Sequence, residues 1–567
     1  MVKNVFMTGF SSVLAFLLGC LWTQYWLLGN QTNVKIVCNV GKGSEKSTDV
    51  EPVDSLGNQL HMDYVLGPSE NTGTQVLEDD YANDNLTNYL TELEKAETSI
   101  GIKPQILYIN LRGENPILYV KTMRELGIRL VYESKFPSPK ALASFKGTGV
   151  FCNGLPAACK PQVLREKLPR YVQHGNLMSY YSVLFVMDKA RFDKVLVDGI
   201  QGDSEMSKFL FKSWTFPANR AKAIEYSQNN PESKFIVKPV KGTKGEGISI
   251  VEGSKLKNIA RNVLVQEYME KPLLIHGKKW DIRMYVIVAS LNPLRVYLSD
   301  DGLIRFAATK YSGSTRRSAF LTNTHVSRNS ANQTRSSNVW GFKHMENVIG
   351  TEKWNTLFES LRKAVGILFQ SAEIYWLDHG TGIRSHHIFG VDAICSEEYT
   401  CKLIEANSRP DMIISKRTRD EYSLAKVATM TGFLSTTFLK NGSSVKKLRT
   451  LLDGFKGDLN KLKKSDWLYL IQYISEAPNR GGLASVYPNP NFLATQRRFV
   501  EMHKARFPES RLVLHDVLAH IEPQLEAEQV SELASVELDL ETGENDDQFN
   551  ENGSPDAKNI TQISPEQ

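Results

Sequence analysis

The chain has few cysteines, six in 567 residues. Small secreted scaffolds held together by disulfides carry a far higher density, so that class of protein is excluded. The pairs Cys152/Cys159 and Cys395/Cys401 are spaced more widely than the C-x2-C to C-x4-C pairs of structural zinc sites, and no quartet of ligands accompanies them. We therefore expect ordinary buried thiols, because disulfides are possible only in an oxidising compartment.

The net charge is also small, +5, but it conceals two opposite regions. From Pro523 to the end there are twelve acidic residues and one lysine, which leaves 67 basic and 51 acidic residues in the rest of the chain. A basic body suits an acidic partner such as nucleic acid, an anionic membrane or an acidic protein surface. A solvated surface with excess lysine explains the same numbers equally well.

Motifs of several enzyme classes are missing as well. No stretch has the G-x4-G-K-[ST] order of a P-loop, and no motif marks a nucleophilic Ser or Cys. The remaining composition, 41% hydrophobic and 23% charged, is that of an ordinary globular protein. Its length allows two or three domains with a sizeable core.

Residues 4–34 contain no charge, and the apolar stretch at 13–28 approaches the roughly 20 residues that span a bilayer. Trp22 and Trp26 lie near its end, where interfacial aromatic residues are common. A cleaved signal peptide would have a shorter apolar core and a small-x-small cleavage site. We therefore expect an uncleaved single-pass transmembrane helix over 1–34.

The orientation of this membrane anchor stays open. Lysines flank it on both sides, at positions 3, 35, 42 and 46, so the positive-inside rule does not decide which end faces the cytosol. Sequons for N-glycosylation indicate lumenal exposure only weakly, because such triplets are frequent by chance. They lie at Asn30, Asn85, Asn332, Asn441, Asn552 and Asn559.

The rest of the chain divides by composition. A βαβ start is predicted by an apolar run at 105–110, a helical pattern with a closing glycine at 116–127 and a second apolar run at 129–132. The expected regions are a flexible acidic stem over 35–100, an α/β domain over 101–204, a motif-rich catalytic domain over 205–415, a basic helical extension over 416–515 and an acidic disordered tail over 516–567.

A loop rich in lysine and glycine joins two apolar runs at 235–250. Its glycines allow backbone N–H groups to approach phosphate oxygens, and Lys238 and Lys244 add positive charge. Alone, this loop is explained at least as well by a solvated hairpin turn. The segment 263–269 then alternates like a strand that leads into a linker, which is an ordinary buried strand or one wall of a slot for a nucleotide base.

Charged residues alternate along the next predicted strand. Lys279, Asp281 and Arg283 are spaced two apart, so they share one face of the strand. The intervening residues Ile282, Met284 and Val286 face the other way, toward a core. A row of surface ion pairs gives the same pattern, but a charged face on a largely buried strand requires a polar cavity.

Arg305 lies inside a further apolar strand, where an unpaired guanidinium is costly. Either a bound anion or a structural carboxylate would satisfy it. Later, Asp392 is followed by Glu405 and Asn407, which share a strand face. These oxygen donors suit Mg²⁺, which combines a few carboxylates with phosphate oxygens and water, whereas zinc prefers His or Cys.

In this order the motifs resemble those of the ATP-grasp ligases, specifically the tubulin–tyrosine ligase-like family. The matching blocks are 211–217, 236–239, 244–248, 266–269, 277–283, 302–306, 321–323, 389–392 and 405–410. The resemblance implies an α/β ATP-grasp fold, preceded by an N-terminal α/β domain. It also implies an enzyme that uses ATP and magnesium to join an amino acid to a protein carboxylate through an acyl phosphate.

The resemblance further implies roles for individual residues. The nucleotide would be bound by Lys238, Lys244, Gly245, Gln266, Glu267, Tyr268, Met269, Lys279, Asp281, Thr322 and Asn323. Magnesium would be bound by Asp392, Glu405 and Asn407. Arg283 would steady the transferring phosphoryl group, and Arg305, with Thr324 beside it, would receive the carboxylate of the incoming amino acid.

Departures from the family pattern affect two residues. Glu267 stands where the family often has a basic residue, which puts nucleotide affinity in question. Arg409 replaces a small residue next to the metal set. A membrane anchor is also unusual for enzymes of cytosolic microtubules.

The basic stretch after 415 resembles that of the glutamate-adding members, so the resemblance favours a tubulin polyglutamylase. Its partners would be free glutamate, the acidic tails of tubulin in microtubules and, through the anchor, a membrane, with no nucleic acid and with the catalytic domain in the cytosol. Two alternatives stay open. One is a membrane-tethered microtubule-binding protein with an inactive ligase fold, and the other is a lumenal ligase with an acceptor other than tubulin.

Overall fold

The computed structural model describes residues 104–113, 116–154, 158–168, 173–175, 180–240, 245–311, 317–322, 339–377, 385–414, 421–439 and 444–543. The anchor expected over 1–34 and the stem expected over 35–100 lie outside these residues. Within the described ranges, no helix combines the length and the apolar character needed to cross a membrane.

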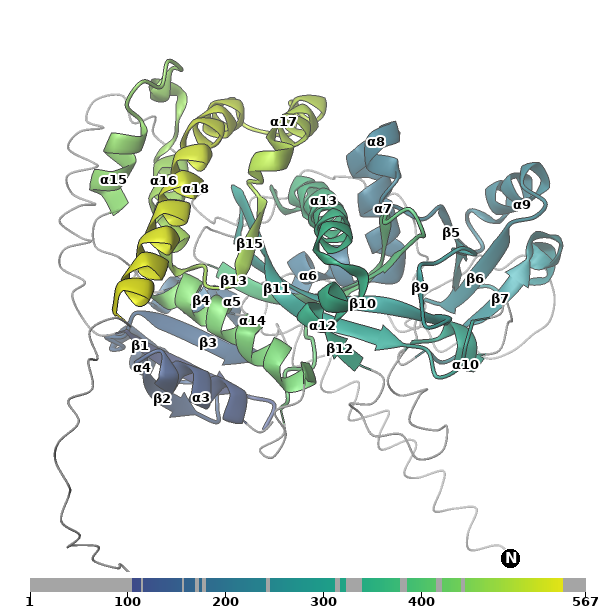
Figure 1. Ribbon diagram of the computed structural model, residues 1–567, viewed down its shortest axis with the longest axis horizontal. Helices are drawn as coiled ribbons and strands as arrows, with labels where there is room; N and C mark the ends of the chain where they lie inside the picture. Colours follow the sequence, from purple (N-terminus) through teal and green to yellow (C-terminus); the bar gives the residue numbers. More distant parts are fainter. Residues whose placement is uncertain are drawn as a thin grey trace, which may run out of the picture. The chain divides into compact units, whose positions relative to one another are not determined.

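The described strands form two sheets (Figure 1). In the 11-stranded sheet the main order is β12 (Val339–Gly341), β11 (Leu294–Phe306), β10 (Lys278–Leu291), β13 (Ser385–Cys395), β4 (Gln173–Gly175), β3 (Gly149–Asn153), β1 (Gln105–Asn110) and β2 (Arg129–Glu133). Off this path, β14 (Cys401–Asn407) pairs with β13, β15 (Leu483–Tyr487) with β11 and β9 (Leu274–Ile275) with β10. The 4-stranded sheet has the order β5 (Ser213–Thr215), β8 (Val263–Glu267), β6 (Lys234–Pro239) and β7 (Ser249–Glu252).

The N-terminal elements form a parallel half of the large sheet. β1 pairs in parallel with β2 and β3, β3 with β4, and β4 with β13. The predicted βαβ start is confirmed as β1, α3 (Ile117–Glu125) and β2. The expected boundary between 204 and 205 does not separate two sheets, because β4 pairs in parallel with β13 of the motif-rich region. The α/β class is confirmed.

Helices cover both faces of the large sheet. One face is covered by α6 (Tyr180–Met187), α7 (Lys189–Ile200), α12 (Phe342–Ile349) and α13 (Thr351–Trp376). The other is covered by α3 and α14 (Glu421–Phe438). The small sheet packs against α9 (Arg220–Asn229) and the 3-10 turn η1 (Gly253–Asn258). Short helices are α4 (Pro139–Ala143), α5 (Pro161–Lys167), α8 (Ser204–Ser207) and α10 (Arg317–Phe320).

The alternation along β10 is confirmed. Ile282, Met284 and Val286 are fully buried in the core cluster beneath α13. On the opposite face, the charged residues are followed by Tyr285 and Ile287, which pack with α14. The charged residues of β10 therefore lie on the same face of the sheet as the residues that α14 covers further along the strand.

The C-terminal region is helical but not a separate layer. It contains α15 (Ser444–Leu451), η3 (Leu459–Lys461), α16 (Lys464–Glu476), η4 (Ala477–Asn479), η5 (Pro490–Phe492), α17 (Leu493–Met502) and α18 (Ser510–Gly543). Between η4 and η5, β15 enters the large sheet beside β11. The boundary expected at 415/416 therefore does not divide the sheet either.

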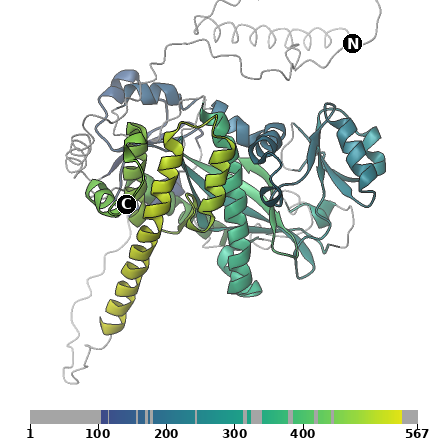
Figure 2. The ribbon, with the colours of Figure 1, turned by 90° about the horizontal axis from the view of Figure 1, so that it is seen from above.

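The expectation of a disordered tail from 516 onward is wrong up to Gly543, where α18 ends (Figure 2). Leu514, Leu518, Ile521 and Leu525 are buried in a cluster with α15 and α16. They recur every three to four residues, which is the spacing of one helix face. The prediction of disorder was based on the number of acidic residues and did not take this helical spacing into account. Residues 544–567 lie outside the described part of the chain.

The expectation of free thiols is also wrong. Disulfides join Cys152 to Cys159 and Cys395 to Cys401. In the second pair the two cysteines are direct partners in the antiparallel ladder of β13 and β14, with their Cα atoms 3.9 Å apart. The spacing in the sequence did not reveal this, because a short hairpin turn brings the two residues opposite each other.

Candidate active site

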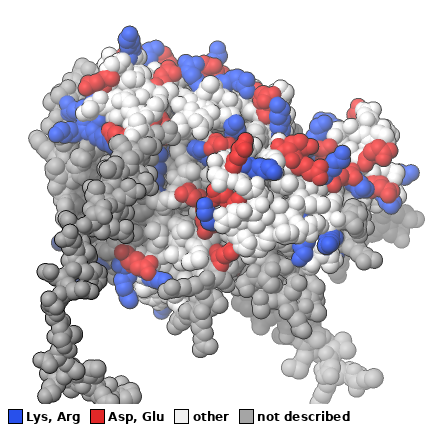
Figure 3. All heavy atoms as spheres, in the orientation of Figure 1, with Lys and Arg blue, Asp and Glu red and all other residues white. Residues whose placement is uncertain are grey.

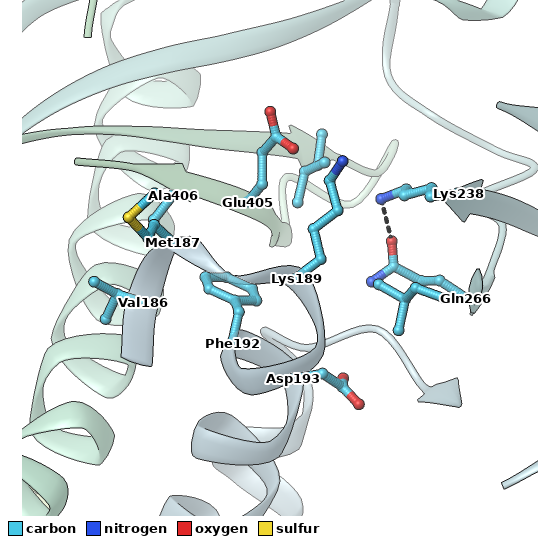
Figure 4. A pocket seen from close by; sticks show the side chains of 11 residues that line it. Val186, Met187, Lys189, Phe192, Asp193, Lys238, Gln266, Glu405 and Ala406 are labelled. Atoms are coloured by element: carbon cyan, nitrogen blue, oxygen red, sulfur yellow. Dashed lines mark hydrogen bonds between the residues drawn. The ribbon is translucent and has the colours of Figure 1, made fainter. Parts of the chain in front are cut away.

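The predicted polar residues meet between the small sheet and one edge of the large sheet (Figure 4). Lys238 on β6 and Gln266 on β8 come from the small sheet, and Glu405 comes from β14. Lys189, the first residue of α7, extends toward Glu405 and Lys238 in Figure 4. These four side chains line one small pocket.

Arg305 is held by a structural carboxylate, one of the two alternatives that the sequence left open. On the facing positions of β10 and β11, its Nε and Nη2 donate to the two oxygens of Asp281 at 2.7 Å each. The hydroxyl of Thr322 donates to the same carboxylate at 2.5 Å. This bidentate pair is buried, so it fixes the guanidinium in one orientation.

Asp392 lies between two arginines. Its Oδ1 accepts from Arg283 Nε at 2.5 Å and its Oδ2 accepts from Arg283 Nη2 at 3.0 Å, while Arg305 Nη2 lies 3.1 Å from Oδ2. Burial pushes the pKa of Asp392 upward, but the two guanidinium groups outweigh it and hold that pKa below the ordinary value. Asp392 is therefore an anion at neutral pH.

Two buried lysines lie on the nucleotide side. Lys238 Nζ donates to Gln266 Oε1 at 2.7 Å, and Lys279 Nζ donates to the hydroxyl of Tyr268 at 3.0 Å. Burial lowers the pKa of Lys238 to about 8 and that of Lys279 to about 7, and the charge of Lys238 lowers the pKa of Lys279 further. A polyphosphate would reverse this effect, because an anion stabilises the protonated amines.

The predicted metal ligands share one face of β13 and β14. Asp392 and Glu405 are direct cross-strand partners, and Asn407 lies two residues further on the same side. Two carboxylates and an amide oxygen fit magnesium, which is usually bound by one or two carboxylates plus substrate phosphates. No group of three or more His, Cys, Asp or Glu side chains suited to a metal is found in the described ranges. The donors therefore fit magnesium that arrives with a nucleotide better than an all-protein metal cage.

Sequence reasoning missed two residues of α7. Lys189 lowers the pKa of Lys238 through charge repulsion, so the two amines are electrostatic neighbours. Asp193, one turn later, lines the same pocket and accepts a hydrogen bond from Ser213 on β5. Burial raises the pKa of Asp193. The helical pattern of α7 gave no signal, because only the fold brings its first turn to the pocket.

The remaining predicted residues differ in their placement. Glu267 points away from the pocket face of β8, where it accepts from the hydroxyl of Tyr226 at 2.9 Å, so its departure from the family pattern leaves the pocket face unchanged. Gly245 adopts a positive φ of 76°, and its carbonyl accepts from Arg317 Nη2 at 2.6 Å. Met269 follows β8 and is half-buried. Lys244, Asn323 and Thr324 lie outside the described residues.

Comparison with known proteins identifies the family of the region that carries the site. Residues 161–430 match the sequence model of the tubulin-tyrosine ligase family. Residues 161–430 are therefore a region of this family. The match runs from α5 into α14 and contains every predicted site residue, whereas β1, β2, β3 and β15 of the large sheet lie outside it.

Relatives in the family are glutamate-adding enzymes by name. The chain is 30% identical over 224 residues to a tubulin polyglutamylase of Danio rerio, covering 36% of this chain and 29% of that one. It is 31% identical over 229 residues to a tubulin monoglutamylase of Mus musculus, covering 37% and 19%. The chain thus spans less than a third of the length of these two relatives.

Among solved structures, the chain is similar to the C-terminal domain of Pby1 from K. lactis, described as an ATP-grasp enzyme that interacts with the mRNA decapping enzyme Dcp2. The sequence identity is 19% and the TM-score is 0.41, over 59% of this chain and 92% of that one.

Proposed function

We propose that this chain is an ATP- and magnesium-dependent ligase that joins glutamate to a protein carboxylate. The observation that carries the proposal is one connected polar face, on which two buried lysines, two arginines and three carboxylates meet between the sheets. Buried charges of this kind are costly unless they are paired or bind a ligand. Lys238 and Lys279 supply cations for the phosphates, and Gln266, Tyr268 and Met269 line the base.

The chemistry follows from the poor reactivity of a carboxylate toward amines. A carboxylate oxygen of the acceptor attacks the γ-phosphoryl group of ATP, giving an acyl phosphate and ADP. The amine of glutamate then attacks the acyl carbon, phosphate leaves, and an amide or isopeptide bond remains. Magnesium, when bound at Asp392, Glu405 and Asn407, neutralises charge on the phosphoryl oxygens.

The arginines orient the reacting groups. Asp392 fixes the guanidinium of Arg283, which steadies the transferring phosphoryl group as charge develops. Arg305 receives the carboxylate of glutamate. Because Asp281 occupies its Nε–Nη2 edge, that carboxylate has to approach from the Nη1 side or displace Asp281.

The acceptor in this proposal is the acidic tail of tubulin, supported by the names of the relatives, and the product is a polyglutamate chain. The basic stretch after 415 is partly neutralised within the chain, because Lys447 pairs with Glu528 and Lys461 with Glu509. Figure 3 shows basic side chains mixed with acidic ones on the visible face. Exposed Lys446 and Arg449 of α15 remain as cations for an acidic tail. The anchor expected at the N-terminus would tether the catalytic domain in the cytosol.

A second candidate is a lumenal ligase with an acceptor other than tubulin. The two disulfides favour it, because such bonds persist in oxidising compartments and are rare in the cytosol. An inactive microtubule-binding protein is disfavoured, because Arg283, Asp392 and Glu405 retain the chemistry of an active site.

The test is incorporation of a labelled amino acid. The full-length chain is incubated with ATP, magnesium and tubulin, and with labelled glutamate, glycine or tyrosine in separate reactions. We expect glutamate to be incorporated, and Glu405→Gln, which keeps the shape but removes a carboxylate, to abolish incorporation. Products of increasing mass on one tail would support polyglutamylation, and single additions would limit it to monoglutamylation.

The same assay separates the two candidates. An absence of all three labels on tubulin, together with incorporation into proteins of the secretory pathway, would select the lumenal ligase. Incorporation that persists in Glu405→Gln would overturn the assignment of this site.

A further inference from the structure

The Cys395–Cys401 disulfide joins the two strands that carry the candidate metal ligands. Cys395 ends β13 three residues after Asp392, and Cys401 begins β14 four residues before Glu405. In the antiparallel ladder the two cysteines are direct partners, and so are the two carboxylates. The covalent bond and the metal ligands therefore depend on the same pairing of strands.

The ladder contains an irregularity between these two pairs. Asp392 pairs with Glu405, but the next residue, Ala393, pairs with Leu403, so β14 has one extra residue, Ile404. Extra residues of this kind disrupt a ladder locally. Because side chains alternate along a strand, a further shift by one residue would move Glu405 to the opposite face. That face is the core side, where Leu403 and Ala406 are buried.

Outside its ladder, β14 is held by the buried side chains of Leu403 and Ala406 and by the N–H of Leu403, which donates to the carbonyl of Phe209 at 3.2 Å. Among the described strands it pairs with β13 alone, so it lies at an edge of the sheet. At its start, Cys401 N–H donates to Ser360 Oγ of α13 at 2.9 Å. Edge strands are held by a single ladder, and their register is set by the turn and by side-chain burial.

We propose that the Cys395–Cys401 disulfide is the element that fixes this register, so that the two cysteines are positioning residues for magnesium binding. The inference rests on the metal role of Asp392 and Glu405 in the proposed function. The bond keeps Glu405 opposite Asp392 on the pocket face, across the irregularity at Ile404. Without it, β14 samples pairings in which the two carboxylates no longer face a common ion.

The bond belongs to the folded protein rather than to a reversible switch. Reduction would add two electrons and two protons, supplied by a dithiol, and would leave two thiols. In the folded chain the exposure of Cys395 is 1% and that of Cys401 is 0%, so a reductant cannot reach the sulfur atoms. Burial therefore protects the bond from reductants in the folded chain.

The second disulfide provides a matched control. Cys152 and Cys159 are seven residues apart and Cys395 and Cys401 are six apart, so both bonds close short loops of nearly equal length. Loop-closure entropy depends on loop length, so the two bonds restrict the unfolded chain to a similar extent. Only the Cys395–Cys401 bond lies on strands that carry the candidate metal ligands.

The experiment compares two double variants of the full-length chain. Cys395→Val with Cys401→Val removes the covalent bond but keeps apolar side chains that suit a strand. Cys152→Val with Cys159→Val does the same at the other bond. We measure ATP binding at increasing magnesium concentration, and hydrogen exchange of the amides in 401–407 without metal.

For the Cys395/Cys401 variant we expect the magnesium concentration at half-saturation to rise about tenfold, the size of effect seen when groups that orient metal ligands are lost. ATP binding without magnesium should be unchanged, and exchange in 401–407 should be faster. The control variant should match wild type in both readouts. Equal magnesium dependence and equal exchange in both variants would overturn the proposal.

Failure of the proposed function gives a different result. Wild-type protein would then show no magnesium-dependent ATP binding at all. Hydrogen exchange would still decide whether the bond fixes the register, because that measurement needs neither metal nor nucleotide.

Discussion

At the scale of single residues, the account depends on charged groups whose state is set by burial. The alternation of Lys279, Asp281 and Arg283 was readable from the sequence, because strand geometry places every second residue on one face. The partner of Arg305 was not readable, because a carboxylate and a bound anion satisfy a buried guanidinium equally well. Only the register of β10 and β11 showed that Asp281 lies opposite.

The two buried lysines predict a pH dependence of nucleotide binding. With pKa values of about 7 for Lys279 and about 8 for Lys238, both are protonated at pH 6 and lose their protons as the pH rises. ATP binds the protonated form, so its affinity should fall about tenfold or more between pH 6.5 and 9. Calorimetric titration at several pH values, with proton uptake measured in different buffers, checks this.

Two controls separate this effect from unfolding. Unfolded lysine has a pKa of 10.5 and binds more protons than the folded residue, so these lysines make the free energy of unfolding rise with pH between about 7 and 10.5. Stability therefore moves opposite to affinity. Lys279→Arg keeps its charge throughout and should reduce the pH dependence to the part that comes from Lys238. An affinity that does not change with pH would contradict the role of both lysines.

Lys189 supplies a third prediction at this scale. Lys189→Ala should weaken the incorporation of glutamate about a hundredfold, the loss typical when one group that stabilises developing charge is removed. Lys194→Ala is the control, because Lys194 lies on the same helix but is exposed and pairs with Asp198. Steady-state kinetics of glutamate incorporation by both variants test this prediction. Equal activities would place Lys189 outside the site.

At the scale of elements, apolar periods predicted helices and strands better than composition did. The spacing of Leu514, Leu518, Ile521 and Leu525 marks one face of α18. The acidic composition of the same segment suggested disorder instead. The pairing of Cys395 with Cys401 was missed for a related reason, because it depends on a hairpin and not on the spacing of metal motifs.

Buried ion pairs at the start of α18 connect this helix to the sheet. Glu373 of α13 accepts from Arg511 of α18 and from the backbone N–H of Leu294 on β11, and both charged side chains are buried. Glu373→Ala leaves Arg511 buried without its carboxylate, so it should lower the free energy of unfolding by about 3–5 kcal/mol. Urea unfolding measures the change.

The control for this variant is a surface pair in the same region. Lys461→Ala removes the exposed pair with Glu509 and should change stability by about 0–1 kcal/mol. Similar values for the two variants would contradict a structural role of the buried pair.

At the scale of the whole molecule, the described chain is organised around a sheet that crosses the boundaries expected at 204/205 and 415/416. β4 from the N-terminal region and β15 from the C-terminal region both pair with strands of the motif-rich region. Composition could not show this, because long-range strand pairing leaves no local signal. The order of the motifs along the chain did identify the family. The motif residues are far apart in the sequence, and the fold brings them together.

One prediction follows for shortened chains. Ending the chain at 515 removes Leu518, Ile521 and Leu525 from the cluster with α15 and α16. Each such buried side chain contributes about 1.5–3 kcal/mol, so this chain should melt at a clearly lower temperature than one that ends at 543. Thermal unfolding of the two chains tests the role of α18. Equal melting temperatures would show that the helix adds no stability.

The most direct test of the central claim is photo-crosslinking with 8-azido-ATP in the presence of magnesium, because it locates the nucleotide without knowledge of the acceptor. The account predicts labelling of the peptide that contains Gln266 and Tyr268, competition by unlabelled ATP, and weaker labelling in Lys238→Ala. Labelling elsewhere, or none that ATP displaces, would show that the pocket between the two sheets is not a nucleotide site.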